Sequence, residues 1–150
     1  MAEIKRIFDL LDHLVEQYPK EDILAGKVNG EWVKYSSHDY YKYAHYLAYG
    51  LCEIGLKEGD RVVTMSANCP EWNFMDMALS MSGIIHIPIY PTLSSDNYEY
   101  ILRHCEASAV LVSTKMLLGR LRPALERLEN KPQVFTLANI EGEHRMLEIL

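Results

Sequence analysis

The stretch MALSMSGIIHIPIYPTLSS, residues 77–95, lies between Asp76 and Asp96 and contains no Asp, Glu, Lys or Arg. Its length is close to the ~20 apolar residues that a membrane-spanning helix requires. Because a glycine, two prolines, a histidine and four serines interrupt it, we do not expect it to span a membrane. We expect it to form the buried part of a soluble protein.

Two different periods within this stretch predict a helix followed by a strand. Apolar positions at Met75 and Leu79 close a helical repeat that we expect to end at Gly83. The segment IIHIPIY, residues 84–90, is short, β-branched and bounded by Gly and Pro, which indicates a buried strand. A continuous apolar strand after a helix, with both faces covered, is typical of a parallel sheet in an α/β protein.

The same alternation of strands and helices extends along the chain. We expect strands at 61–67, 84–90, 109–113 and 133–138, separated by helices at 70–83, 96–107 and 114–129. The last helix should break near Arg122, because Pro123 disfavours helical geometry in the residue before it. This order predicts a parallel, right-handed βαβ sheet with flanking helices.

An N-terminal helix and a β-hairpin precede the predicted sheet. Apolar residues recur at three- and four-residue steps over residues 4–18, and the pattern stops before Pro19. Within residues 23–36, Asn29-Gly30 separates two β-like runs and supplies the positive φ angles of a tight hairpin turn. Ser36 or the residue after it should cap a second helix.

The C-terminal residues suggest a truncated domain. Met146, Leu147 and Leu150 share one face of a predicted helix that has no stop signal and no partner for this face. We therefore expect residues 1–150 to be one N-terminal subdomain that continues in a longer protein.

Composition excludes several classes of protein. The formal net charge of −6 and a pI near 5.5 argue against a nucleic-acid surface, which requires clustered Lys and Arg. The three cysteines have neither the even number of a disulfide framework nor the spacing of a zinc site. The N-terminus lacks the features of a signal peptide, so we expect a cytoplasmic protein.

The chain carries neither a G-x-G-x-x-G nor a G-x-x-x-x-G-K-[ST] loop for nucleotide phosphates. His104 and Cys105 are neighbours that point about 100° apart on a helix, so we interpret both as packing residues. We also expect Cys69, at a helix N-terminus, to be structural and unreactive.

Two acidic residues and one histidine in or near the opening stretch are candidates for acid/base or ligand chemistry. Glu71 and Asp76 are five residues apart on one helix and do not share a face, so they form no acid/base pair. A lone histidine in an apolar strand is more often hydrogen-bonded in the core than a ligand, which is the interpretation we favour for His86. We expect no metal site and no catalytic residue in this chain.

Ordered motifs between Gly55 and Thr114 resemble the N-terminal part of an AMP-forming acyl-CoA synthetase, most closely the long-chain fatty-acid type. The motifs are Gly55, Gly59-Asp60-Arg61-Val62, Asn68 with Glu71-Trp72, Gly83, Pro88-Ile89-Tyr90-Pro91-Thr92 and Tyr100-Ile101-Leu102. The similarity extends back to about Glu31 and covers roughly two-thirds of the chain.

This resemblance implies the first subdomain of a larger adenylation domain. Such enzymes use ATP and Mg²⁺ to convert a fatty acid to an acyl-adenylate, then transfer the acyl group to the thiol of coenzyme A. The family's phosphate loop, adenine-binding segment and catalytic lysine have no counterpart in residues 1–150. The resemblance therefore implies that this fragment has no ligase activity and no cofactor of its own.

The resemblance also suggests one binding site. In acetate-type relatives, arginines after the strand equivalent to residues 109–113 face the nucleotide phosphate of coenzyme A. Lys115, Arg120 and Arg122 fall in that region, although a basic helical face is usually only solvated.

The implied partners are a fatty acid and the remainder of the adenylation domain, with peripheral membrane association and a homodimer left open. A stand-alone α/β binding or interaction module is the alternative function, because fold alone does not determine function.

Overall fold

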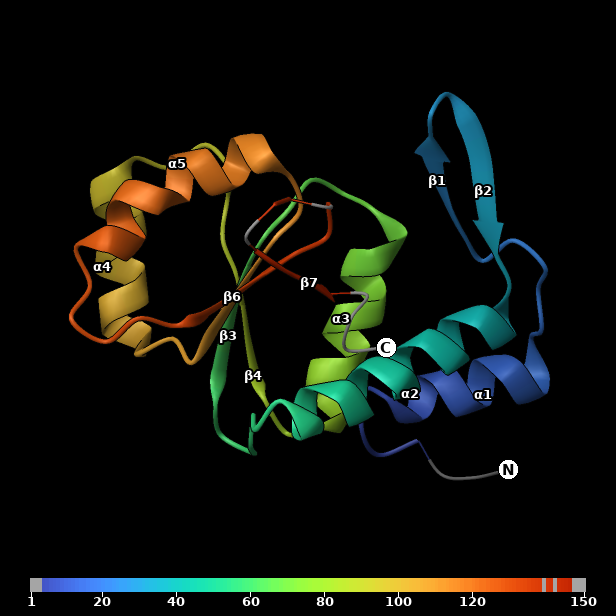
Figure 1. The fold of residues 1–150 in the computed structure, drawn as a ribbon. Coiled ribbons are helices and arrows are strands. Elements are labelled where there is room, and N and C mark those ends of the chain that lie inside the picture. The colour runs from blue at the N-terminus through green and yellow to red at the C-terminus, as the bar shows by residue number, and fades with distance from the viewer. Residues whose placement is uncertain (1–3, 139, 142, 147–150) are drawn as a thin grey trace.

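The computed structural model describes residues 4–138, 140–141 and 143–146 and contains one large sheet and one small sheet (Figure 1). The five strands of the large sheet are parallel and lie in the order β4-β3-β5-β6-β7. They are β3 (Arg61–Met65), β4 (Ile85–Pro88), β5 (Ala109–Val112), β6 (Gln133–Thr136) and β7 (His144–Arg145). The predicted parallel α/β fold is confirmed.

Helices cover the large sheet on both faces (Figure 1). Those on one side are α1 (Asp9–Gln17), α2 (Ser37–Glu53) and α3 (Pro70–Met81), and those on the other are α4 (Ser95–Cys105) and α5 (Lys115–Glu126). The second sheet is the predicted hairpin of β1 (Leu24–Val28) and β2 (Glu31–Tyr35), which extends beyond the helices (Figure 1).

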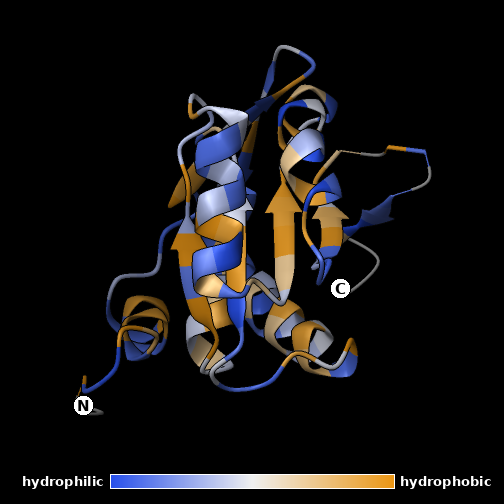
Figure 2. Cartoon of the chain, turned by 90° about the vertical axis from the view of Figure 1, so that its left-hand side faces the viewer, coloured by the Kyte–Doolittle hydropathy of each residue, from blue (hydrophilic) through white to orange (hydrophobic). Residues whose placement is uncertain are grey.

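The two central strands, β3 and β5, divide the hydrophobic core into two clusters. Val62 and Leu111 pack with α2 and α3, whereas Val63 and Val110 pack with α4 and α5. All four side chains are at most 2% exposed. Successive side chains of a strand alternate between its faces, so these apolar runs need helices on both sides. Figure 2 shows hydrophobic strands enclosed by helices that carry hydrophilic residues.

Local sequence signals place several element boundaries as predicted. Asn29 and Gly30 have positive φ angles of 51° and 88° at the hairpin turn. Ser36 is the N-cap of α2, and its hydroxyl accepts a hydrogen bond from the backbone N–H of Asp39 at 3.0 Å. The Asp39 carboxylate accepts one from the backbone N–H of Ser36 at 2.8 Å, which completes a capping box.

The last helical residue of α3 is Met81, and Gly83 two residues later terminates the helix, as expected. Gly83 has a φ of +67°, and its backbone N–H donates to the Ser80 carbonyl at 3.3 Å. The backbone N–H of Ile84 donates to the Leu79 carbonyl at 2.9 Å. This pair of bonds is a Schellman motif, which satisfies helix carbonyls that have no intrahelical partner.

The prediction that β4 is a strand with both faces covered is wrong. β4 is the edge strand of the large sheet, and Ile85 is 51% exposed. Pro88 explains the edge position, because a proline has no N–H to donate to a further strand and is tolerated at a sheet edge. Within the described residues, we find no helix that combines the length and the apolar character needed to cross a bilayer.

The prediction that the last long helix breaks near Arg122 is also wrong. α5 continues through Pro123 to Glu126. A proline inside a helix costs about 3 kcal/mol, whereas each fully buried leucine contributes about 1.5–3 kcal/mol. Leu118 and Leu121 precede the break point expected from the sequence and Ala124 follows it. All three are at most 2% exposed, and their burial offsets the cost.

The ends of the described chain differ from the sequence predictions. The first helix begins at Asp9 instead of Ile4, and its outer residues are exposed. The short strand β7 was not predicted, and it leads to Met146, which is buried in the core against our expectation of an unpartnered face. Leu147 and Leu150, which belonged to the same expectation, lie outside the described residues.

Replacing Gly83 by Ala should destabilise the fold. A Cβ at this position would lie 2.9 Å from Cγ of Glu58, and the left-handed conformation costs an L-residue about 1–2 kcal/mol. We expect the thermal midpoint to fall by roughly 2–8 °C.

The matched control for this prediction is Gly119→Ala within α5. A Cβ there meets nothing within 4 Å outside the local helix backbone, and alanine favours helix, so the midpoint should stay or rise. Equal midpoints for the two variants in a thermal melt would contradict the boundary at Gly83.

Candidate functional site

The order of strands creates one topological switch point in the large sheet. From β3 the chain passes through α3 to β4 on one side, and then through α4 to β5 on the other side of β3. The segments that leave β3 and β5 therefore diverge to opposite faces of the sheet. In open α/β sheets ligands bind in the crevice outside the carboxyl ends of strands at such a point.

A cavity of about 910 Å³ lies at this switch point. Its floor consists of residues that directly follow β3, β5 and β6, including Ser66, Ser113 and Leu137. Its walls are aromatic and come from β2, α2 and α3: Tyr35, Tyr43 and Phe74. The Phe74 ring lies 5.2 Å from the Tyr35 ring and 5.2 Å from the Tyr43 ring, so these three side chains hold one another in place.

The hairpin closes one side of this cavity. Lys27, Val28 and Asn29 at the hairpin tip line it. A Cβ added to Gly26 would lie 2.9 Å from Cδ of Pro70, at the start of α3. The glycine thus allows β1 to approach α3 closely, which places the hairpin tip over the carboxyl edge of the sheet.

Burial determines the protonation behaviour of two groups in the cavity. It raises the pKa of the Cys69 thiol above its usual value, which keeps the thiol protonated and unreactive. Burial also raises the pKa of Tyr35, and the nearby Glu71 carboxylate adds to this effect. The structural role expected for Cys69 stays a prediction.

Two hydroxyl residues after β5 differ in their bonding. Thr114 is the N-cap of α5, and its Oγ1 accepts a hydrogen bond from the backbone N–H of Leu117 at 3.2 Å. The Ser113 Oγ is buried and has no hydrogen-bond partner within the described part of the chain. A buried hydroxyl without a partner costs free energy, so Ser113 is an unsatisfied polar group beside the cavity.

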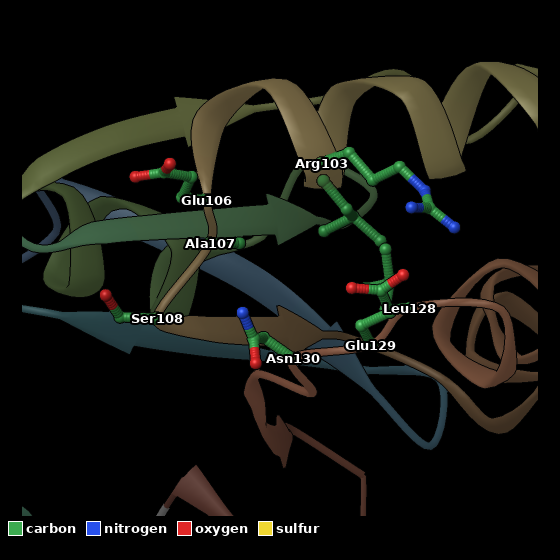
Figure 3. A pocket seen from close by; sticks show the side chains of 8 residues that line it. Arg103, Glu106, Ala107, Ser108, Leu128, Glu129 and Asn130 are labelled. Atoms are coloured by element: carbon green, nitrogen blue, oxygen red, sulfur yellow. The ribbon is translucent and has the colours of Figure 1, made fainter.

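A second cavity, of about 640 Å³, lies at the opposite edge of the sheet (Figure 3). Three of its polar side chains take part in internal bonds. Ser108 Oγ donates to the Asp60 carboxylate at 3.0 Å, and Arg103 donates to the Arg127 carbonyl at 2.8 Å. Glu106 pairs with Arg61 at 3.1 Å. We therefore interpret this cavity as a packing gap between secondary-structure elements, and the carboxyl-edge cavity as the candidate site.

The predicted coenzyme A residues all lie on α5, but two of them contact different parts of the protein. Arg120 Nη1 donates to the Pro91 carbonyl at 3.0 Å, whereas Arg122 Nη2 forms an ion pair with Glu143 at 2.8 Å. Lys115 is exposed and directly follows Thr114 in the cavity wall. Arg120 and Arg122 are about 200° apart around the helix, so they face different surfaces. Their contact with coenzyme A stays a prediction.

His86 is hydrogen-bonded on both sides, which confirms one part of the sequence interpretation. Its Nδ1 lies 2.6 Å from Oδ1 of Asp76, and its Nε2 lies 2.8 Å from Oγ1 of Thr64. Sequence reasoning weighed Asp76 only against Glu71, and it missed this cluster, because sequence spacing does not show that β4 lies beside β3 and α3.

His104 and Cys105, which the sequence places side by side, have separate packing contacts. The His104 ring stacks on Tyr100 at 5.7 Å, and the Cys105 thiol donates to the Leu102 carbonyl at 3.7 Å. Among the described residues there is no group of three or more His, Cys, Asp or Glu side chains that could hold a metal ion.

The chain is thus an α/β domain with an aromatic cavity at the carboxyl edge of a parallel sheet. Residues 11–146 match the family model of the AMP-binding enzymes, and the chain belongs to this family. This confirms the family resemblance seen in the ordered motifs.

Comparison with known proteins gives relatives of the same kind. Long chain acyl-CoA synthetase 1 of Arabidopsis thaliana is 25% identical over 155 residues, which cover 99% of this chain and 24% of the relative. The chain therefore spans about a quarter of the length of this relative.

Two solved structures share the fold. A luciferase-like enzyme from the nonluminescent mealworm Zophobas morio has a TM-score of 0.79 at 15% identity, covering 95% of this chain and 32% of that chain. The anthranilate CoA ligase AuaEII in complex with anthranoyl-AMP has a TM-score of 0.75 at 20% identity, covering 97% and 27%.

Replacing Ser113 and Thr114 separately by Ala should give opposite results. Ser113→Ala removes a hydroxyl that has no partner, so we expect an unchanged or higher free energy of unfolding. Thr114→Ala removes the N-cap bond of α5 and should cost about 1 kcal/mol. Urea unfolding of both variants measures this, and a larger loss for Ser113→Ala would show that its hydroxyl has an internal role.

Proposed function

We propose that this chain is the N-terminal part of an ATP-dependent long-chain fatty-acid–CoA ligase. The proposed enzyme converts a fatty acid and ATP to an acyl-adenylate and then transfers the acyl group to coenzyme A. The observation that carries the proposal is the family match over residues 11–146. The relative named a long chain acyl-CoA synthetase supports the choice of acyl substrate.

In this proposal, the described residues form a scaffold that supports chemistry located elsewhere in the longer protein. The described residues offer no cluster that fits Mg²⁺, and the sequence contains no glycine-rich phosphate loop. Burial of β3 and β5 between helices makes a rigid wall on which further segments can be positioned. The aromatic cavity at the carboxyl edge is the surface that we expect to face the adenylation centre.

Coenzyme A is the cofactor for which this chain offers candidate contacts. Lys115, Arg120 and Arg122 supply cationic groups for a nucleotide phosphate. Among them, Arg120 is the strongest candidate for a nucleotide contact, because its hydrogen bond to the Pro91 carbonyl places it next to Tyr90 in the chain. Tyr90 is 76% exposed and offers a ring face to a base.

The proposed location is the cytoplasm, with peripheral association to a membrane left open for an enzyme that takes long-chain acids. A homodimer is likewise left open. The competing function is a stand-alone α/β binding module that shares the scaffold and has no adenylation chemistry.

The test is enzymatic and uses the complete gene product. With hexadecanoate, ATP and Mg²⁺ we expect fatty-acid-dependent exchange of pyrophosphate into ATP, followed by acyl-CoA formation when coenzyme A is added. The 150-residue chain alone should show neither activity. A folded complete protein without pyrophosphate exchange, for this or any shorter acid, would favour the binding module.

Replacing Arg120 and Arg122 together by Ala in the complete enzyme tests the coenzyme A contacts. Loss of a charge-assisted hydrogen bond costs about 1.5–3 kcal/mol, so the KM for coenzyme A should rise about tenfold or more. The adenylation half-reaction should be unaffected. Arg103→Ala, which removes the same charge at the opposite edge of the sheet, is the control, and an unchanged KM in the double variant removes the assignment.

A further inference from the structure

Thr64, His86 and Asp76 form a hydrogen-bonded relay that the ligase proposal does not use. A carboxylate only accepts hydrogen bonds, so His86 Nδ1 carries the proton that is donated to Asp76 Oδ1 over 2.6 Å. In the neutral imidazole, Nε2 is then an acceptor, and the Thr64 hydroxyl donates to it over 2.8 Å. Asp76 thus fixes the tautomer that accepts a proton from Thr64.

Three neighbouring elements hold these side chains in place. Thr64 lies on the central strand β3, His86 on the edge strand β4 and Asp76 on α3, which covers this face of the sheet. The parallel register pairs Thr64 with Pro88, two residues beyond His86. The Trp72 ring lies 5.2 Å from the His86 ring and restricts its rotation. The relay is therefore built on rigid elements rather than on loops.

A cavity of about 480 Å³ at the carboxyl edge of the sheet has Thr64, which is 1% exposed, among its lining residues. Trp72, Pro88, Ile89 and Tyr90 give it mainly apolar walls. Its volume is within the range of about 300–1,000 Å³ that is typical of small-molecule sites. The amide of Asn68, which also lines the cavity, has no side-chain hydrogen bond within the described residues and can donate to a ligand oxygen.

A hydroxyl bonded to an imidazole, which is oriented in turn by a carboxylate, is the arrangement of an activated nucleophile. We propose that Thr64, His86 and Asp76 form an acyl-transfer site that hydrolyses small carboxylic esters with short apolar acyl groups. This activity belongs to the chain itself and does not depend on the proposed ligase function.

The reaction has two balanced steps. Thr64 Oγ1 attacks the ester carbonyl carbon while His86 Nε2 takes the hydroxyl proton, and the alcohol leaves with that proton, which gives an acyl-threonine. Water then attacks the acyl-threonine with His86 as base, the acid is released, and the proton returns to Thr64. We assign oxyanion donation to the amide of Asn68, which lines the same cavity, and Asp76 is a positioning residue that acts through His86.

The experiment measures hydrolysis of 4-nitrophenyl butyrate by the complete gene product in the absence of ATP and coenzyme A. It also measures covalent labelling by diisopropyl fluorophosphate, with the labelled residue located by peptide mass spectrometry. We expect hydrolysis above the buffer rate and a single adduct on Thr64. No hydrolysis above buffer, or an adduct on another residue, would overturn the proposal.

Variants separate catalysis from structure. Thr64→Val keeps the shape without the hydroxyl and should lower the rate at least tenfold, whereas Thr64→Ser should retain it. Asp76→Asn should also lower the rate at least tenfold, and Asp76→Glu should restore part of it because a carboxylate is present again. Ser80→Ala, which removes a hydroxyl from α3 outside this cavity, should change the rate less than twofold.

Thermal melting accompanies each variant. If Thr64→Val does not fold, the position of the adduct in the unaltered chain and the rates of the Asp76 variants test the proposal. Asp76 is partly exposed, so we expect its variants to fold. A folded Thr64→Val variant with the original rate would show that the relay only supports the edge strand.

Discussion

Parallel pairing of β3 with β4 on one side and β5 on the other is the interaction on which the rest of the structure depends. It requires the chain to cross from one side of β3 to the other between β4 and β5. The crossing places α3 and α4 on opposite faces, so both faces of β3 are buried. The same crossing separates the segments that follow β3 and β5 and opens the carboxyl-edge cavity between them.

Two kinds of site follow from this arrangement at the same edge of the sheet. Between β3 and β5, the cavity is large and aromatic and suits a surface that faces further parts of an AMP-binding enzyme. Between β3 and β4, the cavity is smaller and ends at the relay of Thr64, His86 and Asp76. Both cavities lie where the strands end, so the segments at this edge of the sheet determine what each site can bind.

Much of the fold was predictable from the sequence, because its signals are local. Gly83 ends α3 through backbone geometry, and the apolar runs of β3 and β5 require cover on both faces. The two wrong predictions, for α5 and β4, arise where two sequence signals favour different structures. Pro123 disfavours the helix, but its free-energy cost is smaller than the gain from burying the neighbouring leucines. Pro88 indicates an edge strand, whereas the isoleucines of β4 indicate a buried one, and the prediction followed the isoleucines. The relay was not predictable, because it joins three elements that only the folded sheet brings together.

The measurement that tests the central claim most directly is the length of the native gene product. It is obtained by reading the coding sequence past Leu150 and by measuring the mass of the protein isolated from cells. We predict a protein of several hundred residues with a Ser/Thr/Gly-rich loop soon after the segment described above. A natural stop at Leu150, with a matching mass of 17.3 kDa, would contradict the ligase assignment and leave a stand-alone α/β module.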